Sequence, residues 1–241
     1  MRIVLGEKHA LNWLDFWNGN HSIYVSETHR LRHHERIGED IVKRLLPETG
    51  VVIDYGCGEA LSAQLVARHC GRLILSDGAP SVRDKLNDFH HGATNISVLA
   101  PDEVLDLDEG SVDCIIINSV LQYLAPEATQ ALLRDLTPLL AHNGRIIIGD
   151  IIPPDHTMLA DAGALLHFAW QEQFMTDAMI GLMRTFLSDY RKIRATYGLT
   201  CYSAHEMETM GAKLGLKTQR TALNIGHDQR RMTFEMQKSA A

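Results

Sequence analysis

The stretch VVIDYGCGEA, residues 51–60, decides the fold. Three aliphatic residues precede Asp54, and glycines then occupy positions 56 and 58. An apolar run that ends in a glycine turn is typical of a buried strand followed by a loop that a ligand approaches closely, because glycine adopts dihedral angles closed to other residues and carries no side chain. We therefore expect Gly56 and Gly58 to leave room for a ligand at the carboxyl end of a strand.

Short apolar runs alternate with helical patterns over most of the chain. The runs predict strands at 51–54, 72–76, 96–99, 112–118 and 145–152. Two further strands, at 217–223 and 230–236, are separated only by NIGHDQ, which predicts an antiparallel hairpin at one edge of the sheet. The order predicts an α/β fold: a Rossmann-like, doubly wound, seven-stranded sheet that is mostly parallel and covered by helices.

The 241 residues are expected to form a single domain with two helical additions. A helical cap is predicted at about 9–46, where Leu31, Ile37, Ile41, Val42 and Leu45 make an apolar face. A helical insertion is predicted at about 155–198, after the fifth strand, and it is rich in Met and Phe. Such a surface suits a bulky apolar ligand, but it equally suits core packing or the seam of a homodimer, and the sequence leaves these open.

Charge and cysteine usage exclude several classes of function. The net charge is −7 and no run of basic residues occurs, so a nucleic-acid partner is not expected. The sequence lacks an apolar window of eighteen residues and a leader segment, which predicts a cytoplasmic protein without integral membrane association. The four cysteines form no CxxC pair. His29 and His33 have a spacing that metal ligands use, but no third ligand follows, so we expect a solvated polar helix face and no metal.

Two acids accompany the glycine turn and narrow the choice of cofactor. Asp54 ends the first strand, and Asp77 ends the second, about twenty residues later, where it can accept hydrogen bonds from ribose hydroxyls. A dinucleotide loop places a third glycine where this chain has Leu61, and the charge of Asp54 opposes a pyrophosphate. The pattern favours S-adenosylmethionine, whose amine and sulfonium are positively charged, over a nicotinamide dinucleotide.

From about residue 30 to its end, the chain resembles the class I S-adenosylmethionine-dependent methyltransferases, and most of all the small-molecule members of the quinone-biosynthesis type. VIDYGCGEA is similar to the D/E-x-G-x-G-x-G segment of the family, with Ala60 at its last glycine; LSDGA, LDEGSVDCIIINSVLQYL and LLAHNGRIIIGDIIPP resemble its second-, fourth- and fifth-strand segments. The resemblance implies S-adenosylmethionine as the cofactor. The residues that the resemblance or the residue pattern assigns to the cofactor are Tyr24, Asp54, Gly56, Gly58, Asp77, Asp102 and Asn118.

Two of these assignments need a further step. The position that contacts adenine in the family falls on Pro101, so a shift of one residue gives that contact to Asp102. Tyr24 precedes the first helix and is a candidate lid over the methionine end of the cofactor, although a core tyrosine fits equally well.

Methyl transfer from a sulfonium needs positioning more than acid catalysis, so no sharp catalytic motif is expected. Asp150, at the end of the fifth strand, and His227, in the hairpin loop, are the candidate bases or orienting groups. The predicted reaction is methyl transfer to a small organic or lipid-like acceptor. The alternatives are a nicotinamide-dependent oxidoreductase and a cofactor-binding module without catalysis. The segment NSVLQYL at the fourth strand lacks the Pro-Pro pair of amino-nucleobase methyltransferases, which disfavours methylation of bases.

Overall fold

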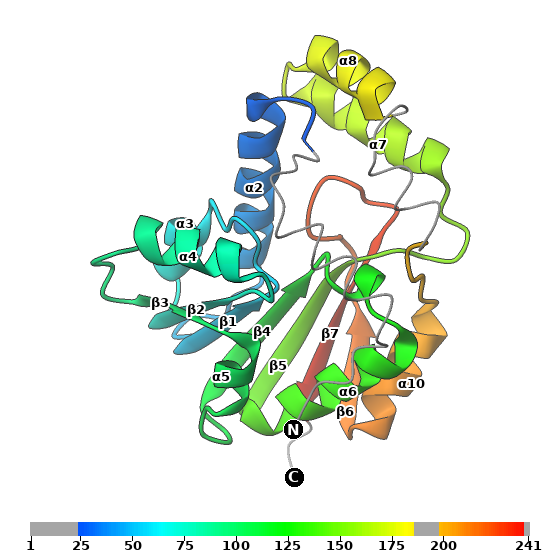
Figure 1. Ribbon diagram of the computed structural model, residues 1–241. Helices are drawn as coiled ribbons and strands as arrows, with labels where there is room; N and C mark the ends of the chain where they lie inside the picture. The colour runs from blue at the N-terminus through cyan, green and yellow to red at the C-terminus, as the bar shows by residue number, and fades with distance from the viewer. Residues whose placement is uncertain (1–23, 186–197, 239–241) are drawn as a thin grey trace.

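The computed structural model describes residues 24–185 and 198–238 (Figure 1). Its seven strands form one sheet in the order β3-β2-β1-β4-β5-β7-β6. The strands are β1 (Val51–Tyr55), β2 (Arg72–Ser76), β3 (Ile96–Leu99), β4 (Val112–Asn118), β5 (Leu140–Ile151), β6 (Leu216–Arg220) and β7 (Met232–Lys238). Strands β1 to β5 are parallel, whereas β7 pairs antiparallel with both β5 and β6. The predicted fold class is confirmed.

The largest departures from the predicted strands occur at the start of β5 and in the hairpin of β6 and β7. Strand β5 begins at Leu140, five residues early, because Leu140 pairs with Val112 before a register shift brings Arg145 opposite Cys114. The connection between β6 and β7 is longer than predicted. Asn224 folds it into a compact loop by donating to the carbonyl of Asp228 (3.0 Å) and accepting from the hydroxyl of Thr233 (2.7 Å).

Helices cover both faces of the sheet. They are α2 (Glu27–Val42), α3 (Ala63–Ala67), α4 (Pro80–Phe89), α5 (Pro101–Leu105), α6 (Pro126–Leu136), α7 (Met158–Gln171), α8 (Met175–Thr185) and α10 (Ala204–Lys213). Alternate residues of each strand enter opposite cores. In β4, Ile115 and Ile117 pack in one core, with residues of α5, α6 and α10, whereas Cys114 and Ile116 pack in the other, with residues of α2, α3 and α4.

The expected apolar face of the N-terminal helix is mostly confirmed. Ile41 is buried, and Ile37, Val42 and Leu45 pack against the same core. The assignment of Leu31 to this face is wrong, since the side chain is 50% exposed. The part of the predicted cap before Tyr24 lies outside the described residues.

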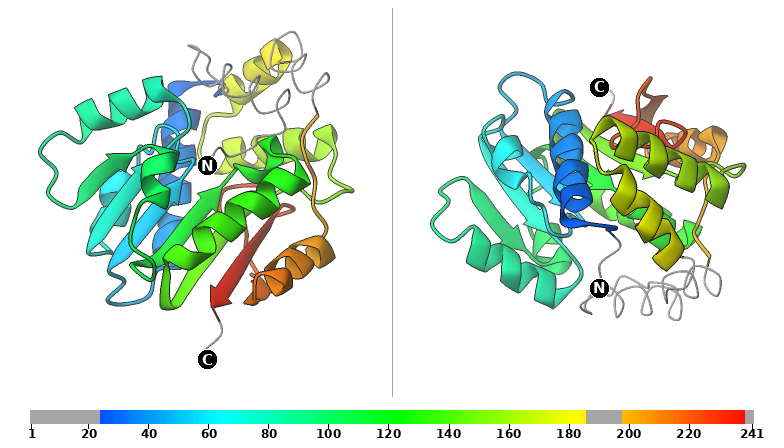
Figure 2. Two further views of the ribbon diagram at one scale, coloured as in Figure 1. Left: turned by 60° about the horizontal axis from the view of Figure 1, so that its bottom comes forward. Right: turned by 90° about the horizontal axis from the view of Figure 1, so that it is seen from above.

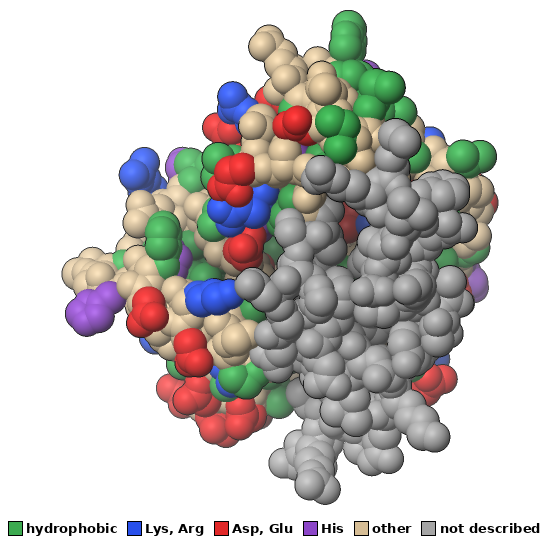
Figure 3. Space-filling view, turned by 45° about the horizontal axis from the view of Figure 1, so that its top comes forward, with side chains coloured by type: hydrophobic (Ala, Val, Ile, Leu, Met, Phe, Trp, Pro, Cys, Tyr) green, Lys and Arg blue, Asp and Glu red, His purple; other side chains and the backbone are tan. Residues whose placement is uncertain are grey.

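The insertion helices α7 and α8 lie above the carboxyl ends of the strands, beside the N-terminal half of α2 (Figures 1 and 2). Phe168, Ala169, Phe174 and Ala178 form a small core there, so part of the insertion is core packing. Other apolar side chains face outward. Leu159, Trp170, Met179 and Ile180 are all exposed, and Figure 3 shows hydrophobic side chains gathered over this part of the molecule. Residues 186–197 of the insertion lie outside the described residues.

None of the helices described is both long and apolar enough to cross a membrane.

Candidate functional site

The glycine loop lies between the carboxyl ends of β1 and β2. The amides of Gly56 and Cys57 both donate to the carbonyl of Ser76, at 2.7 and 3.1 Å, so the loop is tied to the end of β2. Gly56 and Gly58 have φ angles of +74° and +56°, in the region that favours glycine. A Cβ built at Gly58 would meet no atom within 4 Å among the described residues, so the structure leaves space for a ligand there.

At Gly56 the structure shows an additional reason for glycine. A Cβ at this position would clash with the Cγ2 of Val120, which belongs to the loop after β4. Close packing within the protein therefore also favours glycine at position 56, whereas Gly58 borders free space, and the contact of Gly56 with a cofactor stays a prediction.

Asp77 organises the loop with its carboxylate. One oxygen accepts from the amide of Gly58 (3.0 Å) and the other from the amide of Ala79 (2.8 Å). Burial raises the pKa of Asp77, although these two backbone amides act in the opposite direction. Each oxygen can accept more than one hydrogen bond, so the carboxylate can still bind hydroxyl groups of a ligand.

Asp54 is a carboxylate without a counter-charge at the end of β1. It has no hydrogen bond or ion pair with any residue that the structure describes. Burial, and then the neighbouring carboxylate of Asp77, raise the pKa of Asp54 to about 7. A buried acid with such a raised pKa is stabilised when a positively charged ligand group binds beside it.

Asn118 and Asp102 occupy the ends of the neighbouring strands. Asn118 ends β4; its Nδ2 donates to the hydroxyl of Ser119 (3.2 Å), and its Oδ1 is buried without a hydrogen-bond partner in the described chain. Asp102 lies in the first turn of α5, directly after β3, and is exposed. Its charge contributes, after burial, Asp135 and Asp77, to raising the pKa of Tyr55 to about 12. Both residues lie at the predicted edge of the sheet, and their contacts with a cofactor stay predictions.

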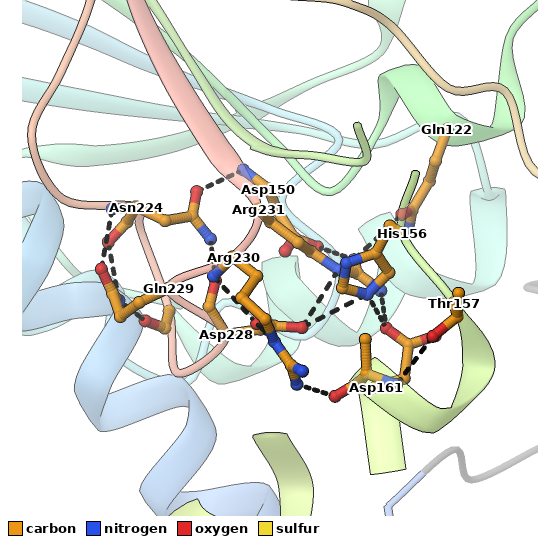
Figure 4. A network of polar contacts seen from close by, with 12 residues as sticks. Gln122, Asp150, His156, Thr157, Asp161, Asn224, Asp228, Gln229, Arg230 and Arg231 are labelled. Carbon is orange, nitrogen blue, oxygen red and sulfur yellow. Dashed lines mark hydrogen bonds and ion pairs between the residues drawn. The ribbon is translucent and has the colours of Figure 1, made fainter. Parts of the chain in front are cut away.

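Asp150 belongs to a network of charged groups at the end of β5 (Figure 4). Its Oδ2 accepts from the hydroxyl of Ser119 (2.7 Å) and from the guanidinium of Arg231 (2.8 Å), which also donates to Asp161 of α7 (2.9 Å). Asp150 has a φ of +61°, and Ser119, at the end of the adjacent strand, has a φ of +59°. Such strained backbone in residues other than glycine is concentrated at functional sites. Sequence reasoning missed Arg231, the counter-ion of Asp150.

A second part of the network is the group that a metal ion could use. His156, Asp161 and Asp228 place ligand atoms within 4.8 Å of one another. The Nε2 of His156 lies 2.7 Å from Asp161 and 3.4 Å from Asp228, and the guanidinium of Arg231 lies beside both carboxylates. Hydrogen bonds and ion pairs thus account for this arrangement, and we assign no metal to it.

His227 is not a solvated loop residue. Its ring stacks on Phe168 of α7, with ring centroids 4.8 Å apart and an interplanar angle of 18°. Burial lowers its pKa, against the attraction of the carboxylate of Asp150. The sequence predicted that His227 lies near Asp150 at the edge of the acceptor site. In the structure the carboxylate of Asp150 affects the pKa of His227.

The interpretation of His29, His33 and His34 as a solvated face is wrong. His29 is buried, and its ring stacks at 5.2 Å on Phe174, which directly precedes α8. His29 and His33 both face His227, with ring centroids 6.3 and 5.6 Å from it. The helices of the insertion and the hairpin loop cover this face of α2, and the sequence of α2 alone cannot show them. We call His29, His33 and His227 the histidine cluster.

Tyr24 lies beside the histidine cluster. Its hydroxyl is 3.1 Å from the Nε2 of His34, and its ring contacts that of His29 edge-on at 5.4 Å. His34 in turn accepts, through its carbonyl, a hydrogen bond from Ser62 in the segment after the glycine loop (2.6 Å). Tyr24 is therefore close to the loop, and its predicted role as a lid stays a prediction.

Comparisons with known proteins agree with the fold. Residues 53–148 match a family model described as a methyltransferase domain. A comparison with curated protein sequences gave no match.

Three solved structures illustrate the likeness. The chain is similar to the N-methyltransferase NodS from Bradyrhizobium japonicum WM9, in complex with S-adenosyl-L-homocysteine (15% identity, TM-score 0.56, covering 97% of this chain and 100% of that one). It is also similar to magnesium protoporphyrin IX methyltransferase from Synechocystis PCC 6803 with S-adenosylhomocysteine bound (16%, 0.56, 96% and 95%). A Haloferax volcanii protein described as a putative methyltransferase, in complex with the Trm112 activator, is similar at 15% identity (TM-score 0.60, 94% and 98%). At such identities, the likeness establishes a shared fold.

Proposed function

Because the chain carries a methyltransferase domain of the class I S-adenosylmethionine-dependent superfamily, we propose that it transfers a methyl group to a small organic or lipid-like acceptor. The observation that carries this proposal is the pair of carboxylates around the glycine loop. Asp54 has no counter-charge among the residues that the structure describes, and Asp77 can accept further hydrogen bonds beside the free space at Gly58. These groups fit a ligand that carries both a positive charge and ribose hydroxyls.

The described residues can hold the cofactor from several sides. Asp54 would face its positively charged end and Asp77 its ribose, while the backbone at Gly58 allows close approach. The unpaired Oδ1 of Asn118 is a further acceptor at the neighbouring strand end. Asp102 is the proposed contact for the adenine amine. When bound, S-adenosylmethionine supplies a methyl group on a good leaving group, so the chain need not protonate the sulfur.

The other roles of the protein in methyl transfer are to position the acceptor and to exclude water. The small core of α7 and α8 packs onto the histidine cluster through Phe168 and Phe174, which covers the ends of the strands with apolar and aromatic groups. A dry site favours in-line attack, because an acceptor held in a near-attack geometry avoids about 7–11 kcal/mol of the barrier. The apolar cover favours an acceptor with a sizeable apolar part.

Two alternatives remain distinguishable by experiment. A nicotinamide-dependent oxidoreductase is disfavoured because Leu61 stands where a dinucleotide loop needs glycine, and because the uncompensated Asp54 would repel a pyrophosphate. A non-catalytic cofactor-binding module would share the carboxylate pair but would need no strained, ion-paired Asp150 at the acceptor side.

Calorimetric titration with S-adenosylmethionine, S-adenosylhomocysteine and NADH in parallel tests the proposal. We expect micromolar binding of the two adenosyl ligands and no binding of NADH. The variant Asp77→Ala should raise the Kd of S-adenosylhomocysteine about 5- to 150-fold, which corresponds to about 1–3 kcal/mol for lost hydrogen bonds to buried hydroxyls. Asp84→Ala, which removes an exposed acid from α4, is the matched control. Binding of NADH alone would overturn the proposal.

A further inference from the structure

Three imidazole nitrogens in the histidine cluster are buried without a partner. These atoms are Nε2 of His29, Nδ1 of His33 and Nδ1 of His227, and none has a hydrogen bond within the described chain. An unsatisfied polar atom in a protein interior costs about 1–3 kcal/mol, so three of them in one place call for an explanation. The rings come from two segments almost 200 residues apart, yet their centroids lie only 5.6–6.3 Å from one another.

The protein holds these two segments together with polar contacts. The amide of Gly226 donates to the carboxylate of Asp40 in α2 (3.2 Å), and the guanidinium of Arg44 donates to the carbonyl of Leu223 (2.6 Å). These two contacts hold the hairpin loop against the N-terminal helix region and thereby keep the three rings close together. A cluster built in this way, with its nitrogens left unpaired, is suited to a ligand that supplies the missing hydrogen bonds.

A hydrogen bond shows which nitrogen of His29 carries the proton. The Nδ1 of His29 accepts from the amide of Val25 (3.3 Å), so in the neutral ring the proton is on Nε2, and this unpaired atom is a donor. Burial is the main cause that lowers the pKa of His29, to about 4, and it also lowers those of His33 and His227. At neutral pH the cluster is therefore uncharged and can offer both donors and acceptors.

The cluster lies beside the strand ends where the proposed reaction takes place. Ile225, two residues before His227, packs against the position of Gly149, next to the side chain of Asn118. Asp228, the residue after His227, lies 3.9 Å from Arg231, whose guanidinium donates to Asp150 (2.8 Å), so the hairpin loop is joined to the end of β5. On one side the rings stack on Phe168 and Phe174, so that side of the cluster is apolar.

We propose that His29, His33 and His227 bind the hydroxyl group of an apolar acceptor and remove its proton during O-methylation. This inference rests on the proposed function and specifies its substrate class. A hydroxyl accepts from the Nε2–H of His29 and donates to an unprotonated nitrogen of His33 or His227. An aliphatic amine is disfavoured, because it is cationic at neutral pH and Arg231 already places a positive charge close to His33.

The step balances without a further reactant. The hydroxyl proton passes to an imidazole nitrogen, an oxygen lone pair forms the new bond to the methyl carbon, and the carbon–sulfur bond breaks with its electron pair left on sulfur. The products are a methyl ether, a neutral thioether and an imidazolium, which returns its proton to solvent.

Binding to the protein loaded with S-adenosylhomocysteine tests the proposal without turnover. The probes are two matched pairs, 2-naphthol with 2-methoxynaphthalene and 1-octanol with methyl octyl ether, and 1-octylamine, which is cationic at neutral pH, is the competing amine. We expect calorimetry to show that the hydroxyl member of at least one pair binds tenfold or more tightly than its ether and more tightly than the amine. Equal binding within both pairs, preference for the amine, or no binding of any hydroxyl probe would overturn the proposal.

Substitutions test whether the histidine cluster causes the preference for hydroxyl probes over ethers. His29→Phe, His33→Phe and His227→Phe keep an aromatic ring but remove the nitrogens, and His91→Phe, at an exposed histidine after α4, is the control. Each cluster variant should lose most of the discrimination between hydroxyl and ether while its Kd for S-adenosylhomocysteine stays within twofold. Discrimination that survives in all three variants contradicts the proposal. If even the unaltered protein fails to bind S-adenosylhomocysteine, the proposed function itself fails; if only the probes fail, the proposed function stands.

Discussion

Replacing Asp54 by asparagine should abolish a proton release that accompanies cofactor binding. In the free protein the carboxyl has a pKa of about 7, because it is buried and lies near Asp77. It is therefore about half protonated at pH 7 and about nine-tenths protonated at pH 6. A bound cation favours the ionised form, so the proton must leave as the ligand binds.

The size of the effect follows from these fractions. Binding of S-adenosylmethionine should release about 0.5 proton at pH 7 and about 0.9 at pH 6. The Kd should be about fivefold higher at pH 6 than at pH 7. Calorimetry in two buffers with different ionisation enthalpies measures the released protons directly. The variant Asp54→Asn should release almost none and should bind with a nearly constant Kd, whereas Glu59→Gln, which removes an exposed acid of the same loop, should behave like the unaltered protein.

The same group makes a prediction for the stability of the free protein. Because the pKa of Asp54 is raised in the folded state, the folded state binds more protons than the unfolded state between about pH 4 and pH 7. The contribution of Asp54 to the free energy of unfolding thus decreases as pH rises, at up to about 1.4 kcal/mol per pH unit. Denaturant unfolding should show that this slope is smaller in Asp54→Asn. Proton release near zero in the unaltered protein at pH 6, or equal release in the variant, would refute the assignment of Asp54.

Three further predictions concern the loop and the network. Gly58→Ala should weaken binding of S-adenosylhomocysteine at least tenfold by calorimetry, with only about 1 kcal/mol lost in unfolding, because the new methyl meets no atom within 4 Å in the described chain. Gly56→Ala should cost more in unfolding free energy, and Val120→Ala should restore part of that loss, which a double-mutant cycle measures; purely additive effects would argue against the clash. Arg231→Met should lower unfolding free energy by about 3–5 kcal/mol, since it leaves Asp150 without its counter-ion; a loss below 1 kcal/mol contradicts the network.

Local sequence signals were sufficient for the sheet and for the cofactor side of the site. The strands at 72–76, 96–99 and 112–118 have the predicted bounds, because each is an apolar run whose ends are marked by polar or turn residues. Asp77 lies where its spacing from the glycine turn places it. Both signals depend on residues close in the chain, which a single sequence displays directly.

The acceptor side depends on contacts between distant segments, and these were missed or misread. The burial of His29 depends on Phe174, which lies 145 positions later. The ion pair between Asp150 in β5 and Arg231, directly before β7, joins groups 81 positions apart in the sequence. The sequence of a helix with three histidines indicates a polar face, because it does not show which other elements cover that face. The sequence therefore predicted that these histidines are exposed to solvent.

The two sides of the site differ in charge, and the difference is suited to the proposed chemistry. Beside the glycine loop, Asp54 has no counter-charge within the described chain and Asp77 has only the nearby Arg83, so the two carboxylates favour a further positive group. On the acceptor side, the carboxylates of Asp150, Asp161 and Asp228 share the guanidinium of Arg231, and burial lowers the pKa values of the histidine cluster. A neutral imidazole can accept a proton, whereas a protonated one cannot. The arrangement therefore attracts the positively charged methyl donor to one side and keeps proton acceptors available on the other, and exchanging these environments would disable both roles.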